Sequence, residues 1–315
     1  MNGFDLSTAS NIYIGGAQAS AVYIGSTKIW PGDEYRIKYL TIRAQGNCYV
    51  TCNNREGADQ AYYSLDDGDT WTAFPAYSSS WKNNTSLSLS TGDEVMLKCT
   101  QTNTDRGLKQ LKVHVTDRYR LEGNIMSMLD GDNFKSSAST RLSYAFYYMF
   151  SGETNLSSIY NLRLPANTLT EFCYCEMFSG CTAITLPVNL PATNLATRCY
   201  NSMFEGCTSL GNTPDLNATT LTDYCYGAMF RDCTSINQAV LPATTLAVGS
   251  YYYMFDGCSN FNKLYFRALD ISASYCVDQM LKDTNQYASG YIYIPQAATY
   301  DTSTFVPSGW TVMRQ

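Results

Sequence analysis

Residues 177–182 read Met-Phe-Ser-Gly-Cys-Thr, and copies of this phrase return along most of the chain. The copies begin at Met128, Met149, Met177, Met203, Met229, Met254 and Met280. Successive copies are 21, 28, 26, 26, 25 and 26 residues apart. A fixed period in the twenties is typical of stacked coils, in which each unit buries its apolar face against its neighbours. The sequence therefore predicts a repeat architecture over this part of the chain.

The pattern within one unit predicts its local structure. With the methionine as position 0, apolar or thiol side chains fall at positions −4, −3, 0, +1 and +4. This spacing favours a short helix with one buried stripe, ended by the glycine at position +3 as its C-cap. The apolar run at 183–186 then predicts a strand in a parallel ladder. We expect one short helix and one strand in each coil.

A second phrase, Leu-Pro-Ala-Thr at 190–193, keeps the same period and leads into the next unit. Together, the Met-Phe-x-Gly-Cys-Thr and Leu-Pro-Ala-Thr phrases resemble the BspA-type leucine-rich repeats of gut Bacteroidales and of their phages. The resemblance covers about residues 121–292. It implies a right-handed solenoid used for adhesion or as a display surface, and it does not imply an enzyme.

The chain is expected to be a multi-domain β and α/β protein with four parts. These are an N-terminal β anchor at 1–34, an antiparallel β-sandwich at 35–120, the leucine-rich-repeat-like solenoid at 121–292 and a C-terminal cap at 293–315. Residues 124–134 are expected to form the first, capping unit of the repeat, and Phe305 and Trp310 to close its last coil.

The first 34 residues contain a small repeat of β-forming residues and glycines, which predicts short strands. An ordinary hairpin packed on the next domain is one interpretation. The other is an anchor, because segments of this kind resemble those that join modules to phage particles. The residues expected to make that attachment are Tyr13, Ile14, Tyr23, Ile24 and Trp30.

Residues 35–120 show short β-forming runs separated by polar turns, which is typical of an antiparallel sandwich. The predicted strands are 38–42, 48–51, 61–65, 86–89, 95–98 and 111–115. Residues 64–71 match the Asp-box pattern known from sialidases. We interpret it as a structural hairpin turn, in which Asp66 accepts backbone hydrogen bonds, Gly68 permits the turn and Trp71 packs beneath. A calcium site is the alternative, but one short loop offers few oxygen ligands.

Composition and charge narrow the classes of function. The 315 residues carry a formal net charge of −6, and a chain of this charge lacks the clustered Lys and Arg that nucleic-acid binding needs. No run of 18 apolar residues is present, so membrane insertion is not expected. The first residues do not resemble a secretory signal. If Met1 is the native start, we expect a protein made in the host cytoplasm and carried on the virion.

No motif indicates catalysis, a metal site or a cofactor. The single histidine, His114, lies inside a predicted strand and is interpreted as structural. Eight of the twelve cysteines follow the repeat at positions −4 and +4 and are interpreted as buried core thiols, with disulfides as the alternative, and Cys48 and Cys52 are interpreted as strand residues. We assign no catalytic residue, no metal ligand and no cofactor.

Positions −2 and −1 are expected to face solvent, and tyrosines occupy both of them in two units. Exposed tyrosines suit contacts with sugars or proteins. The candidate binding residues are Tyr147, Tyr148, Tyr252 and Tyr253.

The expected function is a non-enzymatic phage virion component: a fibre, tail or capsid-appended protein. Its N-terminus would bind other virion proteins, and its repeat would bind a host-surface glycan or protein. The sequence leaves open whether copies associate, for example as a trimer. The alternatives are a bacterial cell-surface leucine-rich-repeat adhesin and, less favoured, a glycan-cleaving enzyme.

Overall fold

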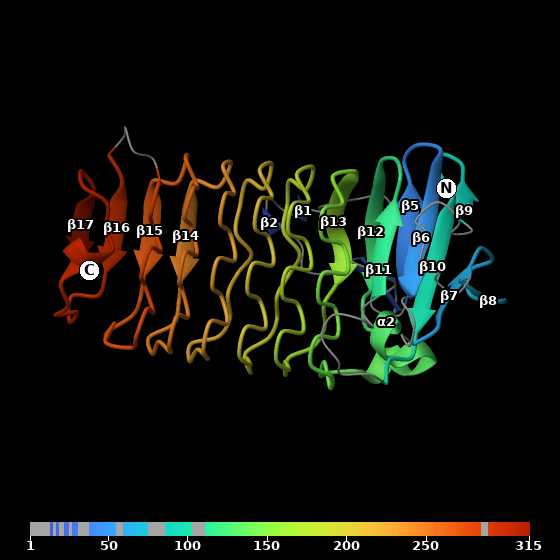
Figure 1. The fold of residues 1–315 in the computed structure, drawn as a ribbon, viewed down its shortest axis with the longest axis horizontal. Coiled ribbons are helices and arrows are strands. Elements are labelled where there is room, and N and C mark those ends of the chain that lie inside the picture. The colour runs from blue at the N-terminus through green and yellow to red at the C-terminus, as the bar shows by residue number, and fades with distance from the viewer. Residues whose placement is uncertain are drawn as a thin grey trace.

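The structure is a computed structural model that describes residues 13–14, 17–18, 22–24, 27–30, 38–54, 59–74, 86–102, 111–284 and 289–315. The molecule is elongated, with coils stacked along its long axis between the N-terminal sheets and a C-terminal sheet (Figure 1). The described part is rich in β-strands, forms several sheets and contains one short α-helix.

Four short strands precede the first large sheet. They form two antiparallel hairpins, β1 with β2 and β3 with β4. Their bounds are β1 (Tyr13–Ile14), β2 (Ala17–Gln18), β3 (Val22–Ile24) and β4 (Thr27–Trp30).

Two sheets follow, one with six strands in the order β13-β12-β5-β10-β7-β8 and one with three in the order β11-β6-β9. Their strands are β5 (Leu40–Ala44), β6 (Cys48–Asn54), β7 (Ala61–Ser64), β8 (Thr72–Ala73), β9 (Leu87–Leu89), β10 (Glu94–Cys99), β11 (Leu111–Val115), β12 (Tyr119–Asn124) and β13 (Leu156–Arg163). Each of the six strands predicted from sequence overlaps one of these, while β8 and β12 were not predicted. All pairs are antiparallel except β12 with β13.

The core of these sheets continues into the repeat. Alternate side chains such as Ile42 on β5 and Val113 on β11 are fully buried in the same cluster as the repeat core. The parallel pairing of β12 with β13 carries the six-stranded sheet into the first coil. The predicted boundary between residues 120 and 121 falls inside β12.

The Asp-box interpretation is confirmed as a structural turn between β7 and β8. The Asp66 carboxylate accepts hydrogen bonds from the backbone N–H and the hydroxyl of Thr70, at 2.9 and 2.5 Å. A hydrogen bond from the Ser64 hydroxyl, together with the two from Thr70, lowers the pKa of Asp66 to about 2. Gly68 has a φ of 93°, and the Trp71 ring packs against Tyr39 at a centroid distance of 4.7 Å.

Six coils carry the repeated phrase, and we name them A to F by their methionines. These are Met149, Met177, Met203, Met229, Met254 and Met280. Positions −6 to +4 of each coil form one side of the stack, the turn side. Here the N–H groups at positions −5, −3, −1, +1 and +3 donate to carbonyls of the next coil, at 2.7–3.2 Å across every junction from A to F. The N–H groups at the intervening positions donate to the carbonyl of the residue three positions earlier in the same coil, as the Cys175 N–H does to the Phe172 carbonyl.

The helix expected in each coil is wrong. The backbone instead turns every four residues, because positions −5, −1 and +3 all have a positive φ. At positions −5 and −1 the φ values lie between 51° and 60° in every coil. A left-handed residue at every fourth position interrupts an α-helix and turns alternate N–H groups toward the neighbouring coil. The buried stripe survives because a chain of four-residue turns repeats nearly in phase with 3.6 residues per turn.

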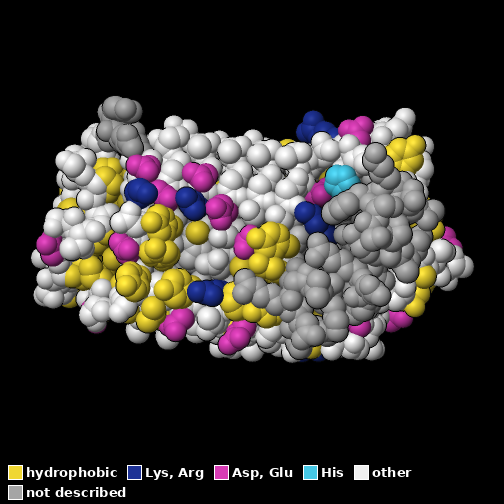
Figure 2. Space-filling model, viewed as in Figure 1, with side chains coloured by type: hydrophobic (Ala, Val, Ile, Leu, Met, Phe, Trp, Pro, Cys, Tyr) yellow, Lys and Arg dark blue, Asp and Glu magenta, His cyan; other side chains and the backbone are white. Residues whose placement is uncertain are grey.

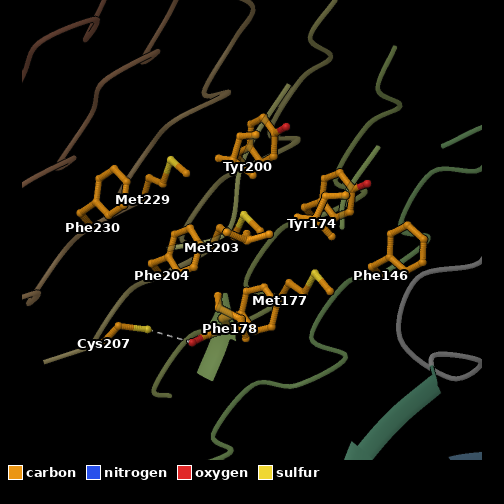
Figure 3. Close-up of a cluster of buried hydrophobic side chains, with 14 of the residues drawn as sticks. Phe146, Tyr174, Met177, Phe178, Tyr200, Met203, Phe204, Cys207, Met229 and Phe230 are labelled. Carbon is orange, nitrogen blue, oxygen red and sulfur yellow. Dashed lines mark hydrogen bonds between the residues drawn. The ribbon is translucent and has the colours of Figure 1, made fainter. Parts of the chain in front are cut away.

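Aromatic columns fill the turn side of the core (Figure 3). Phenylalanines at position +1 stack at centroid distances of 5.7 to 5.8 Å from coil A to coil E. Tyrosines at position −3 stack beside them, as Tyr174 does on Tyr200 at 5.6 Å. The cysteine thiols at position +4 donate to a carbonyl of the preceding coil, as Cys207 does to Phe178. All twelve cysteines are buried and free, which confirms their assignment to the core.

The opposite side of the stack, the strand side, is less regular. Its strands are β14 (Gln238–Leu241), β15 (Lys263–Phe266), β16 (Tyr291–Ile294) and β17 (Thr311–Arg314), which pair in parallel in that order. The strand expected at 183–186 is wrong, and no regular ladder joins β13 to β14 in the described chain. Pro187 and Pro214 lie in this interval and cannot donate to a ladder.

Short helical segments close both ends of the stack. The stretch predicted as the capping unit contains α2 (Ser127–Asp130) and the 3-10 helix η1 (Gly131–Ser136), with Met128 and Phe134 fully buried. At the C-terminal end lies a second 3-10 helix, η2 (Thr302–Thr304). Phe305 and Trp310 follow it and pack their rings against Phe266 and Phe261 of the last coils.

Candidate binding groove

The turn side keeps large side chains where glycine would cost less. A left-handed backbone is strained for any residue with a Cβ atom, and most so for bulky ones. At position +3, four of the six coils avoid this strain by having glycine: Gly152, Gly180, Gly206 and Gly257. At positions −5 and −1, only Gly249 is a glycine, and the other eleven residues carry side chains. Retained strain of this kind is typical of surfaces whose side chains have a function.

A groove with a volume of about 530 Å³ crosses these positions in coils B to F. Its lining residues are Phe172, Cys175, Glu176, Arg198, Asn201, Ser202, Glu205, Tyr224, Gly227, Ala228, Arg231, Tyr252, Tyr253 and Lys282. The residues at positions −2 and −1 of coils C and D, Asn201, Ser202, Gly227 and Ala228, are small. The larger side chains of the neighbouring coils and of position −5 surround them. Figure 2 shows a face on which hydrophobic side chains gather with basic and acidic ones between them.

One border of the groove is a column of stacked rings and one arginine at position −5. The rings of Tyr144 and Phe172 stack at a centroid distance of 4.7 Å. The Arg198 guanidinium lies 5.5 Å from the Phe172 ring and 4.9 Å from the Tyr224 ring, within cation–π range of both. The Tyr224 ring lies so close to Gly249 that a Cβ atom there would be 2.3 Å from it. Packing therefore fixes Arg198 and Tyr224 in position.

A charged cluster at position +2 forms the other border. Arg231 pairs with Asp256 at 3.2 Å and with Glu205 at 3.7 Å, and its guanidinium lies 5.6 Å from the Tyr253 ring. Asp256 is buried, and this desolvation raises its pKa although Arg231 and Lys282 oppose the rise. The positive charge of Arg231 is thus largely neutralised by carboxylates of the protein itself.

The four tyrosines predicted as binding residues lie on the turn side. Tyr252 and Tyr253 line the groove, and their rings meet edge-on at 4.4 Å. Tyr147 and Tyr148 form a similar pair at 4.3 Å in coil A, outside the lining. The expected exposure is wrong for Tyr147, which is 9% exposed, while the other three are half-buried.

Tyr148 is connected to the groove through one of its lining residues. Burial raises the pKa of Tyr148, and a hydrogen bond with the Glu176 side chain raises it further. Glu176 lines the groove. The tyrosine pair of coil E thus lines the groove, while Tyr148 of coil A only contacts one of its lining residues.

The sequence analysis missed the groove residues at positions −5 and +2. A signal for them was present, because Arg198 and Arg231 are the only basic residues between positions 164 and 262. Positions −5 and +2 lie three or four residues from positions −2 and −1, so they share a face in a helix as well as in this ladder, but the prediction rested on the paired tyrosines alone.

The residues predicted for virion attachment lie on the N-terminal hairpins. Tyr13 and Ile14 form β1, Tyr23 and Ile24 belong to β3, and Trp30 ends β4. The surroundings of their side chains lie outside what the structure describes.

A smaller pocket of about 360 Å³ lies at the C-terminal end of the stack, between coil F and the segment 303–308. Coil F has no following coil, so the N–H groups of Gln279 and Leu281 have no partner within the described chain. Across the described residues, no group of three or more His, Cys, Asp or Glu side chains is arranged to hold a metal ion. No helix among them has the length and apolar character needed to cross a membrane.

Comparison with known proteins gives one match. Residues 173–292, from coil B to β16, match the family described as "Mycoplasma protein of unknown function, DUF285". No curated protein matches the chain, and no solved structure matches it.

Proposed function

We propose that this chain is a non-enzymatic binding protein that presents the groove of its turn side to a glycan or protein of a host-cell surface. In this proposal it is a fibre, tail or capsid-appended component of a phage particle, and residues 1–34 attach it to other virion proteins. The repeat region would be a right-handed leucine-rich-repeat-like solenoid of the BspA type, which the repeated phrases resemble.

The observation that carries the binding role is the retention of residues other than glycine at strained backbone positions. Eleven of the twelve residues at positions −5 and −1 carry a side chain despite a left-handed backbone, which costs about 1–2 kcal/mol per residue. The ladder accepts glycine at one of these positions, Gly249, so its hydrogen bonding does not depend on a side chain there. Seven of these eleven residues line one groove, where aromatic and charged groups lie beside the Asn201 amide of position −2, which supports a ligand-contacting role.

The binding role is tested by removing two aromatic side chains that line the groove. We expect the double variant Tyr252→Ala/Tyr253→Ala to lose at least about tenfold in affinity for host cells, because aromatic residues dominate the energetics of contact sites. The control is Tyr291→Ala on β16, an exposed tyrosine of the strand side. Equal binding by the wild-type protein and the groove variant would contradict the proposal.

The virion role is tested by proteomics of purified particles with chemical cross-linking. Cross-links from Lys28 on β4 to a tail, portal or capsid protein would support attachment through the N-terminal segment. The second candidate is a bacterial cell-surface adhesin, since the matched family is described from Mycoplasma, which is a bacterial source. Recovery of the protein in a bacterial surface fraction, and its absence from particles, would support the adhesin instead.

A further inference from the structure

The basic residues of the repeat are concentrated in the groove. Arg198 and Arg231 are the only Lys or Arg residues between positions 164 and 262, and both line it, together with Lys282 of coil F. The chain as a whole has a net charge of −6, so this concentration opposes the average charge of the protein. The lining carries these three cations against the two carboxylates of Glu176 and Glu205, and a net positive groove in an acidic protein favours a ligand that carries negative charge.

The two arginines differ in how their charge is used. Arg231 is paired with Asp256 and Glu205, as described above. Arg198 has neither an ion pair nor a side-chain hydrogen bond among the residues that the structure describes, although rings pack against it. Its guanidinium therefore keeps its hydrogen-bond donors available while Phe172 and Tyr224 hold it in place.

A guanidinium fixed in this way suits a carboxylate. Its N–H groups form a rigid planar fork that matches the two oxygens of a carboxylate, and aromatic stacking leaves that fork free along its edge. Holding the side chain in advance reduces the entropy lost on binding. The small residues Ser202, Gly227 and Ala228 leave room beside Arg198 for a ligand of more than one chemical group.

The rest of the groove suits a sugar better than a peptide strand. Backbone N–H and carbonyl groups of the turn side are already paired across every junction from coil A to coil F, so the groove offers no open strand edge for an added peptide. It offers tyrosine rings with hydroxyl groups, the Asn201 amide and the Glu205 carboxylate. Aromatic rings next to polar groups bind a sugar by packing against its C–H face and hydrogen bonding to its hydroxyls.

We propose that the groove binds an acidic saccharide, with the carboxylate of a uronic acid unit held by Arg198 and the sugar packed against Tyr252 and Tyr253. This inference rests on the proposed binding function and specifies its ligand class.

The test compares acidic sugars with matched neutral ones. The probes are oligosaccharides of galacturonic acid and of glucuronic acid, and the same oligosaccharides after reduction of the carboxyl groups. Affinity is measured by calorimetry with the full chain. We expect carboxyl reduction to weaken binding by about ten- to a hundredfold, the usual effect of a lost hydrogen-bonded charge. Raising the salt concentration should weaken binding of the acidic sugars alone.

Two substitutions assign the effect to Arg198. Arg198→Gln should weaken binding of the acidic sugars to the level of their reduced counterparts. Arg198→Lys keeps the charge but loses the planar fork, so it should restore only part of the affinity. The matched control is Arg267→Gln, the same change of charge at an exposed arginine next to β15. Circular dichroism and urea unfolding check that each variant is folded.

The outcomes separate this inference from the proposed function. Binding of acidic and reduced sugars with equal affinity, or equal binding by Arg198→Gln and Arg267→Gln, would overturn the acidic ligand and leave the groove as a neutral sugar site. If a sulfated sugar binds more strongly, and does so through Arg198, the assignment of a carboxylate as the acidic group is wrong. If a glutamate-rich peptide binds more strongly than the saccharides, the assignment of a saccharide ligand is wrong. If the groove variants attach to host cells as well as the wild-type protein does, the proposed function itself is contradicted.

Discussion

The two sides of the repeat differ in how regularly adjacent coils are joined. On the turn side, every junction from coil A to coil F has the same set of hydrogen bonds, and the aromatic columns run from coil A to coil E. On the strand side, the parallel ladder stops after β13 and resumes only at β14. The comparison indicates that the turn side holds the coils in register, while the strand side tolerates proline. A rigid turn side is also the better platform for a preformed binding groove.

The largest difference between the two sides should appear in stability. Phe204 at position +1 is fully buried between Phe178 and Phe230, so Phe204→Ala should lower the free energy of unfolding by about 3–5 kcal/mol. Leu186 lies on the strand side and is 45% exposed, so Leu186→Ala should change it by no more than about 0.5 kcal/mol. Urea unfolding measures both. Similar losses from the two substitutions would break the comparison.

A smaller effect should distinguish glycines of the two sides. Gly206 at position +3 has a φ of 71°, and a Cβ atom there would meet no atom closer than 3.7 Å. Gly206→Ala should therefore cost about 1–2 kcal/mol, from the left-handed backbone alone. Gly211 has no positive φ and also has space for a Cβ atom. Gly211→Ala should leave stability unchanged or raise it by up to about 1 kcal/mol. A larger loss at Gly211 than at Gly206 would contradict the backbone assignment.

The smallest predicted effect lies where the turn side meets the N-terminal sheets. In coil A, Glu153 occupies position +4, where coils B to E have cysteine, and its carboxylate contacts His114 Nδ1 at 2.8 Å. The hydrogen bond to Glu153 raises the pKa of His114 above its ordinary value of 6.5, against the effect of partial burial. Protonated His114 therefore stabilises the fold fully below its unfolded pKa, and this contribution is lost as the pH rises through the folded pKa.

Because His114 is half exposed, the loss should stay below about 1 kcal/mol between roughly pH 6 and pH 8. The free energy of unfolding measured at both pH values should fall slightly toward pH 8 in the wild-type protein. His114→Gln should abolish this change, since the chain has no other histidine. An unchanged pH dependence in the variant would place its source elsewhere.

The sequence predicts the repeat, its period and most of its buried positions, because each depends on a spacing that is visible residue by residue. Cys173, Tyr174 and Met177 are buried as expected from their positions. The helix was wrong because hydrophobic spacing does not distinguish an α-helix from a series of four-residue turns. Backbone conformation separates the two, and bulky residues such as Phe172 and Arg198 do not suggest a positive φ.

The groove was predicted only in part, for a different reason. Tyr252 and Tyr253 follow from the excess of tyrosine at positions −2 and −1. Phe172, Tyr224 and Arg198 do not, because no tyrosine pair marks position −5, although this position shares the face of positions −2 and −1 in a helix and in four-residue turns alike. Pro187 and Pro214 explain the interruption of the strand side. The strand expected at 183–186 rested on its apolar residues alone and did not take these prolines into account.

Hydroxyl-radical footprinting of the protein bound to host-cell surface saccharide tests most directly whether the turn side is the binding side. Tyrosine is readily oxidised and occurs on both sides of the stack, so one experiment compares them. We predict protection of Tyr224, Tyr252 and Tyr253 on binding, with Tyr160 and Tyr291 of the strand side unchanged. Protection of Tyr160 and Tyr291, with the groove tyrosines still oxidised, would contradict the assignment.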